Sequence, residues 1–203
     1  RATFGTVTTT TPLDADMAAI DGFRLVLADL AATITANWQG TIDQSDPEFL
    51  HDLRIAVRST RTVLANAKQV LPAARLAPIR SEFAWLADLT STPRDLDVYL
   101  LEWSNYTGPL GAEVTPALQP VRDLLERRRA DSHIELERGL RSKRATTLMR
   151  TWQAWLVESP ISETLPRRAD QPLGRLVAKR VANAHGTLLE RGRQIGPDTP
   201  AAQ

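Results

Sequence analysis

The sequence contains no cysteine, so it can form neither a disulfide nor a thiolate metal site. It also lacks any apolar run approaching the roughly 20 residues of a membrane-spanning helix. The N-terminus does not show the basic, apolar and small-residue order of a secretory signal, and we therefore expect a cytoplasmic protein. Because the chain begins with Arg1 rather than methionine, we expect it to be part of a longer polypeptide.

Motifs of the common enzyme classes are missing as well. We find no glycine-rich Walker loop, no serine nucleophile elbow, and no cluster of carboxylates for the magnesium that phosphoryl transfer usually needs. His133 and His185 look isolated, with no paired acids that would make them metal ligands or catalytic bases. The sequence therefore predicts a binding protein without catalysis, cofactor or metal site.

What the sequence does contain is a succession of amphipathic helical patterns, and no alternating β-branched pattern competes with them. Gly40 and the turn at 43–47 are expected to end the first helix, and Thr92 is expected to cap a new helix that starts at Pro93. The predicted helices cover about 16–38, 47–71, 78–90, 92–105, 116–139, 142–158 and 173–195. The fold class is therefore all-α, in one or more helical bundles.

Apolar residues at helical spacing predict the core. They are Ile20, Phe23, Leu27, Leu30 and Ile34 in the first helix, Leu53, Ala56, Val57, Thr60, Leu64, Ala67 and Leu71 in the second, and Ile79, Phe83, Leu86, Leu89, Leu148 and Leu156 further on. Trp85, Trp103, Trp152 and Trp155 occupy apolar helical positions too, and we expect them to be core residues rather than stacking platforms.

The second helix carries an unusual row of charge opposite its apolar face. At 100° per residue, His51, Arg54, Arg58 and Arg61 share an arc of roughly 80°, and none of the other positions in this stripe is acidic. Like charges in a row repel one another, whereas an ordinary surface helix alternates their sign. The stripe is either a solvated face, or it is neutralised by a carboxylate of another helix or by an anionic ligand.

The overall composition favours a ligand rich in phosphate. The net charge of +1 conceals a basic region at 51–203, which holds 23 bases against 17 acids, and 22 of the 25 bases of the chain are arginine. A guanidinium makes forked hydrogen bonds to phosphate oxygens that an ammonium cannot make. A GC-rich genome, which favours arginine codons, would explain the same bias.

The acidic residues and the histidine near the stripe have two interpretations each. His51 either contacts an anion, with protonation in mild acid strengthening the contact, or it stays neutral and orients an arginine. Asp52, Asp95 and Asp97 are better explained as helix caps or as supports for the basic residues than as catalysts.

A weak internal repeat links the two ends of the chain. The segment 25–28, Leu-Val-Leu-Ala, precedes the related segment 176–179, Leu-Val-Ala-Lys, by 151 positions. In that register, the equivalent of His51 falls near position 202. We therefore expect a second stripe helix to begin about where this chain stops.

These motifs resemble the first repeat of a CHAD domain, the conserved-histidine α-helical domain. The resemblance is carried by H-D-L-R-x-A-x-R-x-x-R over 51–61, by Trp85-Leu86, and by R-D-L-D over 94–97. It implies two similar helical bundles related by a pseudo-two-fold axis, binding of inorganic polyphosphate in a basic groove or pore, and frequent fusion to a triphosphate-tunnel (CYTH) domain.

The resemblance also divides the chain and implies a site. We expect a linker or a disordered N-terminal segment over 1–15, a first bundle over 16–158, a connection over 159–172, and the start of the second repeat over 173–203. The implied polyphosphate-binding residues are His51, Arg54, Arg58, Arg61, Arg94, Lys143, Arg144, Lys179 and Arg180. The chain departs from the family pattern at Ser59-Thr60 and in the absence of a second signature helix.

The functional hypothesis is therefore a non-catalytic module that binds inorganic polyphosphate, in the cytoplasm and in association with polyphosphate granules. A flexible polyanion without bases needs a row of cations and no aromatic stacking, and no tyrosine or tryptophan lies near the stripe. A helical nucleic-acid binder and a scaffold for an acidic protein partner remain the alternatives. The near-neutral net charge and the lack of interleaved aromatics disfavour nucleic acid.

Overall fold

The computed structural model describes residues 12–111, 113–157 and 165–194. All named secondary-structure elements in this part of the chain are helices, so the all-α prediction is confirmed. In chain order the elements are α1 (Ala19–Asp43), α2 (Pro47–Asn66), α3 (Ala73–Leu101), α4 (Trp103–Thr107), the 3₁₀ turns η1 (Gly108–Leu110) and η2 (Thr115–Leu118), α5 (Gln119–Leu140), α6 (Lys143–Val157) and α7 (Leu173–Arg193). Residues 1–11 of the N-terminal segment expected to be a linker lie outside the described residues.

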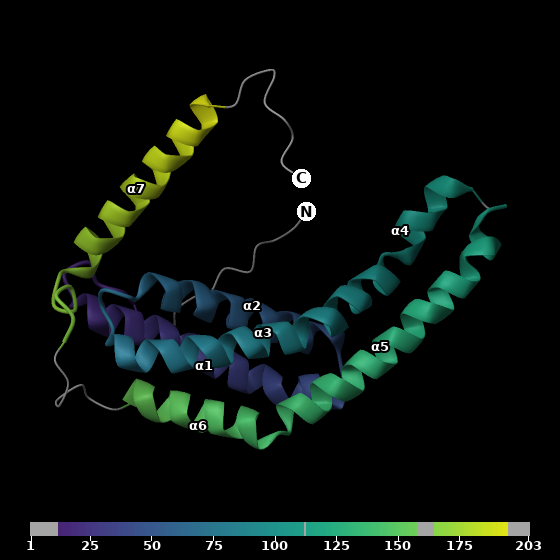
Figure 1. Ribbon diagram of the computed structural model, residues 1–203, viewed down its shortest axis with the longest axis horizontal. Coiled ribbons are helices and arrows are strands. Elements are labelled where there is room, and N and C mark those ends of the chain that lie inside the picture. The colour runs from purple at the N-terminus through teal and green to yellow at the C-terminus, as the bar shows by residue number, and fades with distance from the viewer. Residues whose placement is uncertain (1–11, 112, 158–164, 195–203) are drawn as a thin grey trace.

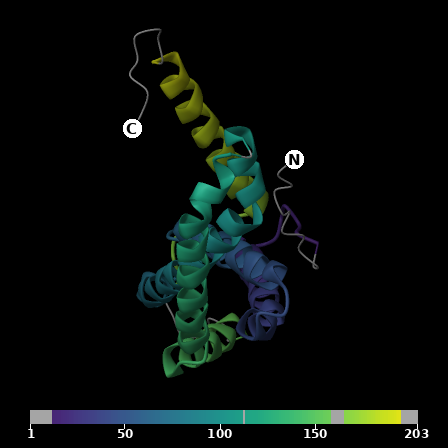
Figure 2. The ribbon, with the colours of Figure 1, turned by 90° about the vertical axis from the view of Figure 1, so that its right-hand side faces the viewer.

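Four helices form the body of the molecule. In Figure 1, α1, α2, α3 and α6 lie roughly along the long axis and pack on one another. The far half of α3 continues beyond this bundle next to α5 and forms an arm that leads to α4. At the opposite end α7 leaves the bundle, and Figure 2 shows it rising away from the other helices. None of the described helices combines the length and hydropathy needed to cross a membrane.

The core lies between the apolar faces that the sequence predicts. Phe83 and Trp152 are fully buried, with ring centroids 5.2 Å apart at an angle of 73°, and Trp155 stacks on Trp152 at 5.1 Å. Trp85 and Trp103 are only half-buried, so the expectation that they are core residues holds for two of the four tryptophans. Burial of such large rings is worth about 1.5–3 kcal/mol each relative to exposure, which makes this cluster a main source of stability.

The basic stripe is on a helix that begins as expected. The Asp46 side chain accepts a hydrogen bond from the backbone N–H of Glu48 at 2.8 Å, and Pro47 takes the first helical position, where its missing N–H costs nothing. The helix ends at Asn66 rather than continuing to Leu71, and the chain turns there so that Ala67 and Leu71 remain buried. α3 then runs back along α2.

Gly40 does not end α1, contrary to expectation. The helix continues to Asp43 and stops at Gln44, whose φ of 50° is left-handed. A Cβ at position 40 would lie 2.4 Å from the ring of Phe49 on α2. Gly40 is therefore needed for the close approach of two helices rather than for a break in one of them.

The helix boundary expected at Thr92-Pro93 is also wrong. α3 runs without interruption from Ala73 to Leu101 and contains both Pro78 and Pro93. A proline inside a helix costs about 3 kcal/mol because it removes one hydrogen bond and crowds the preceding turn. Here Pro93 is itself buried and continues the buried face formed by Phe83, Leu86 and Leu96, so tertiary packing outweighs the local preference.

The starts of α1 and α7 are related by a local two-fold axis. The N–H of Ala19 donates to the carbonyl of Gln171 at 2.8 Å, and the N–H of Leu173 donates to the carbonyl of Met17 at 2.9 Å. A second symmetric pair joins Ile20 to Ala169 and Gly174 to Ala15, around the bridge between Ala18 and Pro172. The first residues of the two helices, Ala19 and Leu173, are equivalent. Position 173 thus corresponds to position 19, an offset of 154 that differs from the 151 of the predicted repeat, and the repeat itself stays a prediction.

Candidate basic groove between α2 and α3

A groove with basic walls runs between α2 and α3. It consists of two adjoining hollows of about 290 and 580 Å³ that share Arg58 and Arg61. We define the basic groove by its six cationic or titratable lining residues, which are His51, Arg54, Arg58 and Arg61 from α2 and Arg80 and Arg94 from α3. The remaining lining residues are small or hydroxylic, apart from Ile55 and Val57, and none is acidic.

The antiparallel course of the two helices brings these residues together. α3 returns along α2, so that Arg94 faces the His51 end of the stripe and Arg80 faces the Arg61 end. Arg94 also donates to the carbonyl of Pro47 at 3.4 Å, across the start of α2. The structure therefore places Arg94 beside the stripe, as the resemblance implied. The distance from Arg80 to Arg94 along the helix axis is about 21 Å at 1.5 Å per residue.

The charges of this groove are poorly compensated. Among the described residues, its one ion pair joins Arg54 to Asp95, and the closest nitrogen and oxygen are 3.9 Å apart. Burial lowers the pKa of Arg54 below its ordinary value, Asp95 opposes that change, and the neighbouring Arg94 and Arg58 add to it. An arginine in this setting is still charged at neutral pH. The groove thus holds repelling cations that an anionic ligand would stabilise.

Arg80 was not anticipated from the sequence. It is 14 residues before Arg94, so at 100° per residue the two side chains differ by only about 40° around α3. This spacing could have indicated that Arg80 and Arg94 share a helix face. The expected boundary near Thr92-Pro93, however, assigns the two arginines to separate helices, 78–90 and 92–105. A single continuous α3 is what puts both arginines on one wall.

His51 occupies the end of the groove and is half-buried. Its possible ligand atoms lie within 4.8 Å of those of Glu48, one turn earlier on the same helix, and of Asp52, the next residue. Both carboxylates are exposed, and exposed groups of this kind are common without a metal ion, so the cluster does not by itself establish a metal site. Asp52 lies in this cluster, and Asp95 contacts the groove through its ion pair with Arg54. The supporting role of the two acids stays a prediction.

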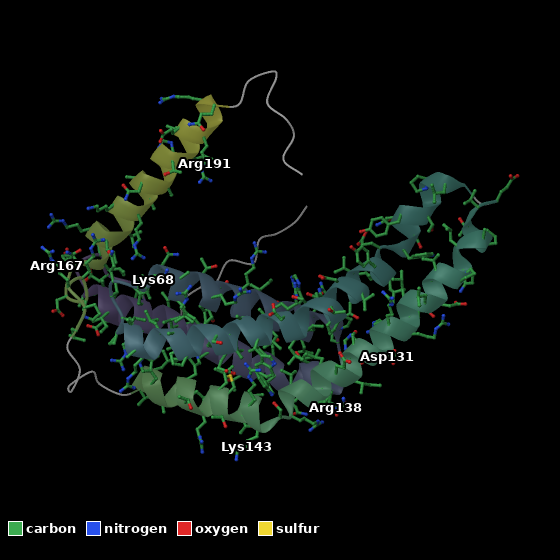
Figure 3. All side chains as sticks on the ribbon, viewed as in Figure 1. Lys68, Asp131, Arg138, Lys143, Arg167 and Arg191 are labelled. Carbon is green, nitrogen blue, oxygen red and sulfur yellow. The ribbon has the colours of Figure 1, made fainter. Side chains whose placement is uncertain are left out.

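Lys143 and Arg144 do not join the groove. Glu82, which binds Arg144, is two residues from Arg80 and therefore about 200° around α3 from the groove wall. The Arg144 guanidinium makes hydrogen bonds of 2.7 and 3.1 Å to both Glu82 oxygens and lies 4.3 Å from the centroid of the Trp85 ring. This pair raises the pKa of Arg144. In Figure 3, Lys143 projects from α6 at the edge of the bundle away from α2.

Lys179 and Arg180 are not in the groove either. Both are on α7, where Lys179 is exposed. The Arg180 guanidinium carbon lies 5.7 Å from the centroid of the Phe23 ring on α1. Of the nine residues implied by the resemblance, the structure therefore gathers the first five and leaves the other four elsewhere.

Asp97 does not support the groove, and His133 is not isolated. His133 Nε2 lies 3.0 Å from Asp97 Oδ1, and Arg129 Nε donates to the same oxygen at 2.5 Å. Asp97 and His133 are both buried, between α3 and α5. Burial acts to raise the pKa of Asp97, but the hydrogen bonds from His133 and Arg129 outweigh it and hold this pKa below its ordinary value. No motif connects residues so far apart in sequence, so only the fold reveals this cluster.

The comparisons with known proteins agree with this architecture. The family model for the CHAD domain matches residues 25–203. The crystal structure of the CHAD domain from the plant Ricinus communis superposes with a TM-score of 0.72 and 25% sequence identity, covering 95% of this chain. This chain spans 62% of that one. No protein with a curated description matches the sequence significantly. With a family match over most of its length and the same helical fold, this chain belongs to the CHAD family.

Proposed function

We propose that this chain binds inorganic polyphosphate along the basic groove between α2 and α3. The observation that carries the proposal is the set of five arginines and one histidine that line a single groove with one weak ion pair between them. Repulsion among these cations costs free energy in the unliganded protein, and a polyanion would remove that cost.

The chemistry of the groove walls fits a chain of phosphates. Arginines supply only donors, and their planar forks match the geometry of phosphate oxygens. The hydroxyls of Thr62, Ser81, Thr90 and Ser91 also line the hollows. No phenylalanine, tyrosine or tryptophan lines either hollow, so the groove offers no platform for nucleobases. Membership of the CHAD family, which is associated with polyphosphate, points to the same ligand.

Further aspects of the proposal concern the whole polypeptide. We infer that the module binds without catalysis, since the groove walls carry no carboxylate. In a longer parent protein, a triphosphate-tunnel domain would supply any hydrolysis. A cytoplasmic location and association with polyphosphate granules follow from the ligand. The two competing ligands are single-stranded nucleic acid and an acidic peptide, which would use the same arginines.

A competition titration tests the proposal. Long-chain polyphosphate, single-stranded DNA and a poly-glutamate peptide are titrated into the protein at one fixed salt concentration, and binding is followed by calorimetry. The triple variant Arg54→Ala, Arg58→Ala, Arg61→Ala should bind polyphosphate at least about a hundredfold more weakly, because hydrogen bonds to charged groups contribute about 1.5–3 kcal/mol each.

A matched control removes the same charge elsewhere. Arg127, Arg128 and Arg150 are exposed and outside the groove, so their replacement by alanine should change affinity only by weak, screened electrostatics. Equal losses in the two triple variants would show that net charge, rather than the groove, determines binding. Tighter binding of DNA or of the acidic peptide would replace polyphosphate with that ligand.

A further inference from the structure

A hollow separate from the basic groove lies between α3 and α6. Its volume of about 480 Å³ is within the range of about 300–1,000 Å³ that is typical of small-molecule sites. Two contacts join the helices beside it, which are the ion pair of Arg144 with Glu82 and the edge-to-face contact of Trp152 with Phe83. Side-chain contacts therefore hold both walls in place.

The spacing of residues on α6 divides the hollow into a floor and an edge. Leu148 and Trp152, four residues apart, are buried and form an apolar floor. Lys143, Thr147 and Thr151, also spaced by four, form a neighbouring row that is exposed. At 1.5 Å per residue, this row is about 12 Å long. The hollow is thus a trough with an apolar floor and a polar edge.

The two threonines of this edge have hydroxyls that are available to a ligand. Thr146, the residue before them, donates to the carbonyl of Ser142 one turn earlier at 3.1 Å. Thr147 and Thr151 make no hydrogen bond of this kind, nor any other side-chain contact with the described part of the chain. Each hydroxyl can therefore donate one hydrogen bond to a ligand and accept others from it.

The charges at one end of the hollow favour a ligand with a single negative group. Lys143 has no acidic partner among the described residues, and it is the first residue of α6, where the helix dipole adds positive potential. Arg144, by contrast, already donates to both oxygens of Glu82. Glu82 itself lines the hollow and repels any second negative charge on a ligand. A polyanion is therefore a poor ligand for this hollow.

We propose that the hollow between α3 and α6 binds a free organic acid with an unbranched apolar chain, which is the chemistry of a medium-chain fatty acid. The carboxylate pairs with Lys143, and the chain lies along Leu148 and Trp152. A narrow trough between two helices suits an extended chain better than a broad ring system. This site shares no residue with the basic groove, so the inference does not rest on polyphosphate binding.

Calorimetric titration of the full chain with sodium decanoate, below its micelle concentration, tests the proposal. Decanoate should bind at least about tenfold more tightly than hexanoate, because each further methylene that is buried strengthens binding. The variant Lys143→Gln should bind decanoate about threefold to tenfold more weakly, because it removes the partner of the carboxylate. The control variant Arg150→Gln removes the same charge from an exposed position of α6 outside the hollow, and it should bind like wild type.

A second pair of variants tests the position of the ligand. Thr147→Phe places a ring on the exposed edge of the trough, and it should weaken decanoate binding at least about tenfold by occupying the space of the chain. Thr146→Phe adds the same ring to the preceding exposed residue, which does not line the hollow, and it should bind like wild type. Far-UV circular dichroism checks that both variants are folded.

Several outcomes would overturn the site. A wild-type protein that does not bind decanoate, equal affinities for hexanoate and decanoate, or equal losses in Thr147→Phe and Thr146→Phe would each do so. Competition between decanoate and polyphosphate would place the acid in the basic groove instead. Binding to phosphatidylglycerol vesicles without binding of free decanoate would replace the free acid with a membrane lipid.

Discussion

Arginines have different partners on the two faces of α3. On the face toward α2, Arg80 and Arg94 add to the arginines of the stripe. Among the described residues, the one ion pair of this groove is the 3.9 Å contact between Arg54 and Asp95. On the face toward α6, α3 presents Glu82, which binds the guanidinium of Arg144 through both oxygens. The same side chain is therefore a potential ligand contact on one face and a structural tie on the other.

The difference lies in what α3 contributes to each neighbour. Toward α2 it supplies the cations Arg80 and Arg94 and one exposed acid, Asp95. Toward α5 and α6 it supplies the acids Asp97 and Glu82. An arginine that already has a carboxylate in fork geometry gains little by exchanging it for phosphate, whereas an unpaired arginine gains a charge-assisted hydrogen bond. Whether a basic residue can bind a ligand thus depends on whether a carboxylate already pairs with it. The number of basic residues alone does not locate a binding site.

Charge reversal on the groove face should have the largest effect. The double variant Arg58→Glu, Arg94→Glu places two carboxylates where phosphates are expected to bind, and polyphosphate affinity should fall by about a thousandfold, since each reversal both removes an attraction and adds a repulsion. Reversal at the paired position, Arg144→Glu, should lower affinity by less than about threefold. Fluorescence titration with long-chain polyphosphate measures both. Similar losses at the two positions would remove the distinction between the faces.

Removal of Asp97 should have a smaller effect, on stability instead of binding. Asp97→Ala leaves the buried His133 and the adjoining Arg129 without their shared acceptor, and breaking a buried ion pair in this way costs about 3 kcal/mol or more. Urea unfolding followed by circular dichroism gives the free energy difference. Polyphosphate affinity at a temperature where the variant is folded should match wild type, and a loss of affinity there would place Asp97 in the binding site after all.

The cluster of Asp97, His133 and Arg129 should make the free energy of unfolding depend on pH. A carboxyl whose pKa is lowered by folding stabilises the native state fully above its unfolded pKa of about 3.9, and the stabilisation is lost as the pH falls through the folded value. Wild type should therefore be more stable than Asp97→Asn at neutral pH, and the difference should shrink below about pH 4. Unfolding free energies measured between pH 3 and pH 7 test this. A constant difference would contradict the assigned pKa direction.

The smallest effect is expected from removing the carboxylate beside the groove. Asp95→Asn should increase polyphosphate affinity by about twofold to fivefold, because it frees Arg54 from a weak, exposed ion pair worth at most about 1 kcal/mol. The matched variant Glu82→Gln releases Arg144 on the other face and should leave affinity unchanged. Calorimetric titration of the two variants distinguishes these results, and equal gains would indicate a general charge effect.

Much of the fold was predictable because helical periodicity is a local property. The apolar face of α2, its start at Pro47, and the start of α7 at Leu173 follow from spacing and capping rules. The failures at Gly40 and Pro93 have one cause. Both residues weaken an isolated helix, yet in the protein Gly40 admits Phe49 and Pro93 is buried, and such tertiary gains are invisible to local rules.

By itself, the sequence determined which side chains share a helix face, which identified the stripe from His51 to Arg61. Its motifs carried the resemblance to the CHAD family. Only the tertiary structure decided which charges meet across helices. In the folded protein, Arg94 and Arg80 lie beside the stripe, Arg144 donates hydrogen bonds to Glu82, and Asp97 contacts His133. The physical reason is that rotation within a helix is fixed by about 100° per residue, whereas contacts between distant segments depend on the packing of whole faces.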